Sequence, residues 1–309
     1  MKGKGETIMK KKCIVKPSIQ VMELFAACGA YDTVQVLERI AGLGFYGAAE
    51  TAVSECGTEA AKLRRVCDDA GMRWTCWAST FINGEKLNMS SVDEQQRVRA
   101  VTRLTELLKM AGDAGANAFS VLSGPAPSEP SAIPAAMKAA ERSLCELALA
   151  AKEYPDMDVL IEPLDRDVHK KNTVGPTRDA VYVIKAARQE NPSVYMAWDS
   201  AHVSLMREDL ITSLSISGNT VGQIHLCNAV LDPEDPLYGD FHMRPGSPGY
   251  LTERRAADII SEAAELELSV DFLPVAVEVR PGKDEDPWEM EKYIRTFLGE
   301  AIRLSLCKK

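Results

Sequence analysis

Short apolar runs alternate with longer amphipathic segments along almost the whole chain. Eight of the runs are predicted to be strands: 19–24, 46–50, 73–77, 117–122, 159–161, 194–198, 222–224 and 275–277. The segments between them place apolar residues at helical spacing, as Val101, Leu104 and Leu108 do. This alternation is typical of parallel βαβ units. Eight strands and eight helices predict a single (β/α)8 TIM barrel, with functional groups at the carboxyl ends of its strands.

Local signals predict where several helices begin. A helix is expected over residues 32–43. Ser91 and Glu94 have the spacing of a capping box. Asp286 followed by Pro287 supplies an N-cap and then proline at the first helical position. These signals predict two helix starts in the first third of the chain and one in the last third.

The sequence has no stretch that resembles a linker between domains. Residues 13–309 are predicted to form one barrel domain, and the polar, lysine-rich residues 1–12 a disordered tail. The proline-rich stretch 124–134 follows the fourth predicted strand and is interpreted as an active-site loop. An open doubly wound sheet is the alternative fold, but the glycine-rich phosphate motifs of such sheets do not occur here.

Composition and charge restrict the classes of function. The chain of 309 residues is 46% hydrophobic and 26% charged, which is typical of soluble globular proteins. Its net charge of −9 argues against nucleic acid as a partner, and its apolar runs are too short to span a membrane. The eight cysteines form no C-x-x-C pair and no secretory signal precedes them, so we expect free thiols in the cytoplasm.

Acidic and histidine residues follow four of the predicted strands. They are Glu162, Asp199, His225 and Glu278. Each has an ordinary interpretation: a surface glutamate, a helix cap, a core histidine, and a carboxylate between two valines. Four such residues at the same end of four successive strands are instead interpreted as the oxygen-rich site of one divalent metal.

Further candidates lie close to these four in the sequence. His202 comes three residues after Asp199, and Asp240 and His242 belong to a polar loop before the last predicted strand. We expect these three to contact substrate or transfer protons. Glu50 ends the second predicted strand and could accept a hydrogen bond from a sugar hydroxyl, although an exposed strand-end glutamate is an equal alternative.

Four segments resemble, in order and spacing, the metal-site motifs of xylose-isomerase-like barrels that act as sugar-phosphate isomerases and epimerases. The segments are Glu162-Pro-Leu-Asp-Arg166, Asp199-Ser-Ala-His202, Gln223-Ile-His225 and Glu278-Val-Arg280. The resemblance covers essentially the whole chain. It implies that Glu162, Asp199, His225 and Glu278 hold one ion, Mn²⁺ first with Mg²⁺, Co²⁺ or Zn²⁺ as alternatives. It also implies that the two glutamates form an acid–base pair and that His202 contacts the sugar.

The expected chemistry begins with removal of a proton next to a sugar carbonyl. The resulting enediolate is stabilised by a divalent ion, and a carboxylate or imidazole of suitable pKa moves the proton. A ketose or sugar-phosphate isomerase, or a 3-epimerase, would use this chemistry.

Two polar stretches, 162–171 and 235–242, resemble a particular branch, the large metal-binding subunits of C-glycoside deglycosidases. That resemblance implies cleavage of 3-oxo-glucosyl C-glycosides by β-elimination, with His202 or His242 in acid–base roles. It also implies a small partner subunit, and a homo-oligomer is a further expectation. We take this lyase interpretation as the main hypothesis and sugar isomerisation or epimerisation as the alternative.

Two other classes share the barrel. An endonuclease IV-like phosphodiesterase would need two more histidines from the amino-terminal half, and this chain has none before His169. The net charge of −9 also opposes a DNA substrate. A barrel without catalysis that binds a sugar or another protein is the remaining alternative, and it predicts no bound ion in the purified protein.

Overall fold

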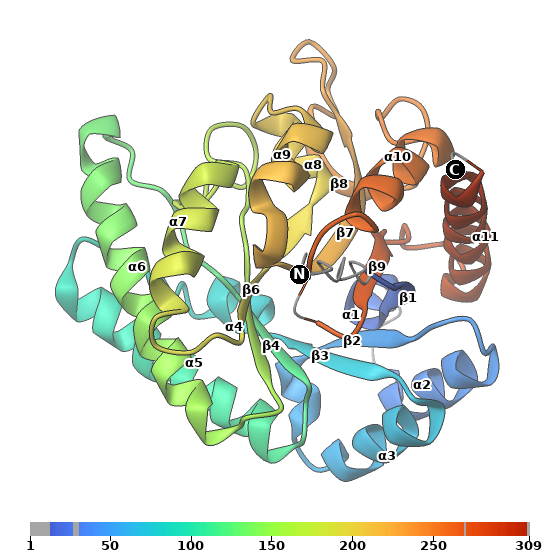
Figure 1. The fold of residues 1–309 in the computed structure, drawn as a ribbon, viewed down its shortest axis with the longest axis horizontal. Helices are drawn as coiled ribbons and strands as arrows, with labels where there is room; N and C mark the ends of the chain where they lie inside the picture. The colour runs from blue at the N-terminus through green and yellow to red at the C-terminus, as the bar shows by residue number, and fades with distance from the viewer. Residues whose placement is uncertain (1–12, 27–30, 269, 308–309) are drawn as a thin grey trace, which may run out of the picture.

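Eight parallel strands close into a barrel in the computed structural model, which describes residues 13–26, 31–268 and 270–307. Neighbouring strands follow one another in chain order, and β9 pairs with both β7 and β1 to complete the ring (Figure 1). The barrel strands are β1 (Val15–Gln20), β2 (Ala48–Ala52), β3 (Arg73–Trp77), β4 (Ala118–Leu122), β5 (Asp158–Glu162), β6 (Val194–Asp199), β7 (Val221–Val230) and β9 (Leu273–Glu278). The predicted (β/α)8 barrel is therefore confirmed, while the expected tail over 1–12 lies outside the described residues.

Helices connect the strands, and the longer ones surround the barrel (Figure 1). They are α1 (Val21–Leu24), α2 (Thr33–Gly42), α3 (Ala60–Ala70), α4 (Ser79–Gly84), α5 (Glu94–Asp113), α6 (Ile133–Ala150), α7 (Thr177–Ala187), α8 (Ser200–Leu205), α9 (Leu210–Ser217), α10 (Glu253–Ala263) and α11 (Pro287–Leu306). The apolar faces of these helices pack on the strands, and Leu37, Leu104 and Ile184 are completely buried there. This layer leaves the carboxyl ends of the strands to carry polar groups.

One strand extends beyond the barrel. The end of β7 pairs in antiparallel fashion with β8 (Gly239–Met243), so the two form a hairpin over the carboxyl ends of the barrel strands. The sequence had predicted a loop here. The polar residues of β8 gave no strand signal, and its pairing partner is separated from it by a turn that periodicity cannot detect.

Other local expectations met different outcomes. Asp286 caps α11 by accepting the N–H of Trp288, with Pro287 at the first helical position, as predicted. The capping box at Ser91 is wrong, because Asp93 caps α5 and Ser91 Oγ accepts the N–H of Asp93. The first strand also begins earlier than predicted, and residues 21–24 form a helical turn instead.

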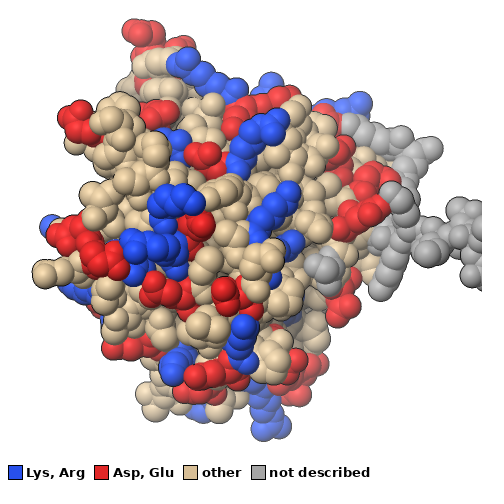
Figure 2. All heavy atoms as spheres, turned by 60° about the vertical axis from the view of Figure 1, so that its left-hand side comes forward, with Lys and Arg blue, Asp and Glu red and all other residues tan. Residues whose placement is uncertain are grey.

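The distribution of surface charge and the state of the cysteines agree with what the composition predicts. Figure 2 shows Lys and Arg side chains interspersed with Asp and Glu over the face drawn. Among the described residues, no helix combines the length and apolar character that crossing a membrane requires. The seven cysteines that the structure describes are free. Location in the cytoplasm stays a prediction.

Candidate active site

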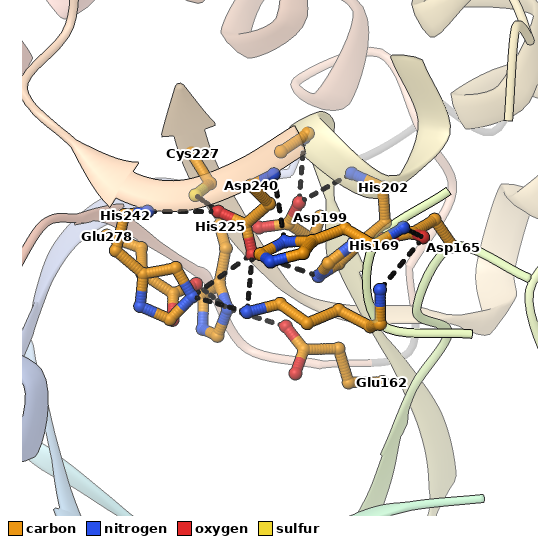
Figure 3. Close-up of polar contacts among 12 residues, drawn as sticks. Glu162, Asp165, His169, Asp199, His202, His225, Cys227, Asp240, His242 and Glu278 are labelled. Atoms are coloured by element: carbon orange, nitrogen blue, oxygen red, sulfur yellow. Dashed lines mark hydrogen bonds and ion pairs between the residues drawn. The ribbon is translucent and has the colours of Figure 1, made fainter. Parts of the chain in front are cut away.

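The four predicted metal ligands lie together at the carboxyl ends of β5, β6, β7 and β9. One ligand atom from each of Glu162, Asp199, His225 and Glu278 lies within 4.8 Å of all the others. His225 Nδ1 lies 3.0 Å from Glu162 Oε1 and 3.2 Å from Glu278 Oε2 (Figure 3). We call these four residues the quartet. Their atoms are close enough to surround one small cation.

Asp199 provides the clearest test of whether a cation fits the quartet. Its Oδ1 accepts the backbone N–H groups of Ala201 at 2.7 Å and His202 at 3.0 Å, which caps α8. Its Oδ2 is buried and has no hydrogen-bond partner among the described residues. Burial, reinforced by the carboxylates of Glu278 and Glu162, raises the pKa of Asp199 to about 7. A divalent cation would supply the missing partner and favour the ionised form.

The two glutamates of the quartet have different environments. Burial raises the pKa of Glu162 above its ordinary value, although His225 opposes the rise. Burial also disfavours ionisation of Glu278, but the neighbouring His242 and His225 outweigh it and lower the pKa to about 2. Two carboxyl groups whose pKa values are pushed apart can serve as acid and base in the same reaction.

The second ring nitrogen of His225 is held from inside the barrel. His225 Nε2 lies 3.1 Å from Glu50 Oε2, and Glu50 also accepts hydrogen bonds from Ser18 Oγ at 2.8 Å and Trp77 Nε1 at 2.9 Å. The Glu50 side chain is completely buried and does not line the cavity described below. Its position therefore does not fit the expected contact with a sugar hydroxyl. It instead fixes the orientation of His225.

A cavity of about 250 Å³ opens beside the quartet. Pockets for drug-sized ligands occupy roughly 300–1,000 Å³, so this one suits a molecule of monosaccharide size. Trp77, Leu122 and Leu164 give it an apolar wall. Its ionisable lining residues are Glu23, Glu162, Lys170, His202, His242, Glu278 and Arg280. Residues 124–134, interpreted above as an active-site loop, do not contribute to the lining.

The β7–β8 hairpin brings His242 to the cavity. It also places Asp240 next to His242, where Asp240 is completely buried and does not line the cavity (Figure 3). His242 lies between two carboxylates, with Nδ1 3.1 Å from Glu23 Oε2 and Nε2 3.1 Å from Asp240 Oδ2. Glu23 also pairs with Arg280, and Asp240 with Lys170 at 3.0 Å. Because both ring nitrogens of His242 already have partners, this geometry favours a role in fixing the charge network over one as a free base.

His202 has a different arrangement. Its Nδ1 lies 3.1 Å from Asp165 Oδ1, while its Nε2 is 3.8 Å from the nearest Asp240 oxygen, beyond hydrogen-bond distance. Burial opposes protonation of His202, but Asp199 and Asp165 outweigh it and raise the pKa to about 9. His202 therefore presents an N–H toward the cavity at neutral pH. The structure is consistent with the substrate contact predicted for this residue.

Several residues of the site were missed by sequence reasoning. Gln20 Nε2 lies 2.9 Å from His225 Nε2, Glu23 contacts His242, and Asp165 contacts His202. Lys170 lines the cavity and was not among the predicted site residues. Asp165 could have been noticed in the segment that follows Glu162. The others had no local signal, because their partners come from distant strands.

A comparison with known families decides the broader identity. The sequence profile described as xylose isomerase-like TIM barrel matches residues 25–293. The chain belongs to this family. A search of curated proteins gave no match.

Solved structures of other members of this fold cover nearly the whole chain. A D-psicose 3-epimerase, solved in the presence of D-fructose, has 15% identity and a TM-score of 0.69 over 94% of this chain and 99% of its own. A 3-keto-D-glucoside 4-epimerase from E. coli has 15% identity and a TM-score of 0.66 over 94% and 100%. The IolI protein, solved with a zinc atom, has 14% identity and a TM-score of 0.68 over 94% and 98%.

At 14–15% identity these structures establish the fold of this chain but not the reaction that it catalyses. Two of the three are sugar epimerases, and none is described as an enzyme that cleaves C-glycosides. The identity of the metal, a partner subunit and a homo-oligomer stay predictions.

Proposed function

We propose that this protein is a sugar isomerase or epimerase that removes a proton next to a carbonyl with the help of one divalent cation. The observation that carries the proposal is the quartet, whose four ligand atoms lie within 4.8 Å of one another beside a cavity of about 250 Å³. A cation held there would stabilise the negative charge that develops on the substrate oxygens. Mn²⁺ is our first choice, with Mg²⁺, Co²⁺ and Zn²⁺ as alternatives.

The side chains of the chain divide the remaining tasks. Glu162 and Glu278 line the cavity, and one of them takes the proton from carbon while the other returns a proton to the opposite face. Their unequal environments fit such a pair. His202 Nε2 donates a hydrogen bond to a sugar oxygen. The apolar side of Trp77 lines the cavity and packs against the sugar ring.

The charges of the cavity favour an uncharged sugar over a sugar phosphate. The lysine and the arginine among its described lining residues are already paired, Lys170 with Asp240 and Arg280 with Glu23. A phosphate would bring further negative charge close to Glu162 and Glu278. We therefore expect D-fructose to be a better substrate than D-fructose 6-phosphate.

Cleavage of a 3-oxo-glucosyl C-glycoside by β-elimination is the second candidate. It begins with the same proton abstraction. The enolate then expels the aglycone, whereas in epimerisation it takes up a proton again. The likeness to a 3-keto-D-glucoside 4-epimerase favours keeping a 3-oxo-glucoside among the substrates to be tested. A small partner subunit belongs to this candidate only.

The proposal is tested with Mn²⁺-loaded protein in D₂O, incubated separately with D-fructose and with a 3-oxo-C-glucoside. Deuterium at a carbon next to the ketose carbonyl supports isomerisation or epimerisation. Release of free aglycone supports elimination. Absence of both, with Mn²⁺ bound, contradicts the proposal and favours a barrel without catalysis.

A variant of the quartet connects the activity to the site. Glu278→Gln should abolish deuterium incorporation, because the amide can neither take the proton nor bind a cation as strongly. Glu285→Gln is the matched control, since Glu285 is an exposed glutamate that pairs with Arg244. A fully active Glu278→Gln protein would remove Glu278 from the acid–base pair.

A further inference from the structure

The loop between β5 and α7 directs one lysine into the candidate active site. Lys170 lines the same cavity as Glu162, His202 and Glu278. Its Nζ lies 3.0 Å from Asp240 Oδ2, and its side chain is 29% exposed while that of Asp240 is completely buried. An ammonium group in this position is desolvated on one side and open to a ligand on the other.

The backbone around Lys170 is held firmly. Asp165 Oδ2 accepts the N–H groups of His169 at 2.6 Å and Lys170 at 3.0 Å. Next along the loop, the N–H of Ala126 donates to the carbonyl of Lys171 at 2.7 Å. Residues after β4 therefore brace the loop from outside. Such support keeps the Lys170 side chain at one place in the cavity.

The neighbouring lysine provides a comparison within the same loop. Lys171 is exposed and has a φ of 52°, so the chain turns sharply after Lys170. Lys171 does not line the cavity. Two adjacent lysines with the same charge thus differ in whether they can reach a ligand.

Hydrogen-bonding capacity further distinguishes Lys170 from His242, whose two ring nitrogens are both engaged by carboxylates. An ammonium group has three N–H donors. Asp240 Oδ2 forms an ion pair with the ammonium group of Lys170 at 3.0 Å, and His242 Nε2 lies at the limit of contact at 3.5 Å. At least one donor therefore remains for an oxygen atom in the cavity.

We propose that Lys170 is a substrate-contacting catalytic residue, whose ammonium group donates a hydrogen bond to a carbonyl or hydroxyl oxygen of the bound sugar. This inference rests on the proposed function. During proton abstraction the C–H proton passes to a carboxylate, the C–H electron pair forms the C=C bond of the enediolate, and the π pair of the carbonyl moves onto the carbonyl oxygen. Lys170 keeps its own proton throughout and stabilises the developing negative charge.

A purely structural role is the competing explanation, in which Lys170 only neutralises the buried carboxylate of Asp240. The two explanations differ in a double variant. Lys170→Met alone removes the lysine partner of Asp240, whereas Lys170→Met with Asp240→Asn removes both charges together. If neutralisation is the only role, the double variant should regain exchange. If Lys170 contacts the sugar, the loss should remain.

The first experiment measures contact without depending on turnover. Mn²⁺-loaded protein is reductively methylated with and without D-fructose, and modification of each lysine is followed by mass spectrometry. We expect D-fructose to slow modification of Lys170 at least tenfold and to leave Lys171 unchanged. Equal slowing at both lysines, or at neither, would overturn the inference.

The second experiment measures deuterium incorporation into D-fructose. We expect Lys170→Met to lower kcat/KM by 10²- to 10³-fold, Lys171→Met to leave it unchanged, and the double variant not to recover. We also expect methylamine to restore part of the activity of Lys170→Ala, which a structural role would not produce. If the wild-type protein exchanges and Lys170→Met or the double variant matches it, this inference fails while the proposed function stands. If the wild-type protein neither exchanges nor protects Lys170, both fail.

Discussion

The carboxylate of Asp199 faces the interior of the quartet with one oxygen that no described protein group contacts. Its raised pKa, about 7, means that ionisation in the folded, metal-free protein is unfavourable. The ordinary value is 3.8, so the contribution of Asp199 to stability is fully present below about pH 4. It is lost as the pH rises through about 7. Burial of the Asp199 carboxylate, reinforced by the neighbouring carboxylates, is the cost of a site prepared for a cation.

For the metal-free protein we therefore predict a loss of thermal stability between pH 5 and pH 8 that Asp199→Asn reduces. The variant should melt a few degrees above the wild-type protein at pH 8 in chelator. Added Mn²⁺ should stabilise the wild-type protein and not the variant. Thermal unfolding at each pH provides the measurement, with the exposed Asp284→Asn as control. Parallel pH profiles for wild type and Asp199→Asn would contradict this account.

A second prediction concerns Glu50, which contacts His225 from inside the barrel. Outer-shell carboxylates of this kind orient a metal-ligating histidine, and their loss commonly weakens metal affinity about 10–100-fold. We expect Glu50→Gln to weaken Mn²⁺ binding by that amount in calorimetric titrations. Glu55→Gln is the matched control, because Glu55 accepts a hydrogen bond from Thr33 nearby on the chain. Unchanged affinity in Glu50→Gln would show that His225 needs no such support.

The residues of the quartet could be predicted because each is an anomaly in its own strand. A charged or imidazole group at the end of an apolar run is visible without any knowledge of partners. The roles of Glu50 and Lys170 could not be predicted in this way. The role of Glu50 follows from its contact with His225, which lies 175 positions away in the sequence. The role of Lys170 follows from its contact with Asp240, which lies 70 positions away. One sequence holds no record of such contacts.

At the scale of elements, local chemistry predicted α2 and α11 well, since Asp32 and Asp286 cap them. The first strand was displaced because Pro17 lies within it, while the apolar residues after Gln20 form a helical turn. A four-residue stretch with three apolar residues, such as 21–24, fits either a strand or one turn of helix. Only pairing with β2 and β9 decides between the two, and that pairing is not local.

The cap of α11 yields the third prediction. Asp286→Ala removes the side-chain acceptor of the Trp288 N–H, which typically costs about 1 kcal/mol of folding free energy. We expect the urea midpoint to fall accordingly while Mn²⁺ affinity stays unchanged, because the cap is separate from the quartet. Asp284→Ala, at an exposed position two residues earlier, should leave the midpoint unchanged. Equal effects at both positions would indicate that loss of surface charge, and not of the cap, is responsible.

At the scale of the whole molecule, residues far apart in the sequence meet in a buried polar contact. Tyr46, just before β2, donates its hydroxyl to Glu291 Oε1 of α11 at 2.9 Å. Arg295 also pairs with Glu291. Burial, followed by the charge of Glu291, raises the pKa of Tyr46 above its ordinary value of 10. The contact ties the last helix to the first quarter of the barrel.

This contact gives the fourth prediction. A folded-state pKa above the unfolded one makes the contribution of Tyr46 fully present below about pH 10 and lost above it. We expect Tyr46→Phe to flatten the alkaline fall of stability between pH 9 and pH 11 and to lower stability at pH 7 by about 1 kcal/mol. Denaturant titrations at each pH test this, with Tyr182→Phe at an exposed tyrosine as control. An alkaline fall that Tyr46→Phe leaves unaltered would assign it to other groups.

Because β7 extends beyond the barrel, the quartet and the hairpin residues Asp240 and His242 are held by different parts of the fold. The quartet residues lie at the ends of strands that close the barrel. The distances between their ligand atoms therefore cannot change much without disrupting the barrel. Asp240 and His242 belong to the β7–β8 hairpin, which is not needed to close the barrel. Substitutions in the hairpin can therefore change which substrate is accepted, while the four residues of the quartet keep their arrangement.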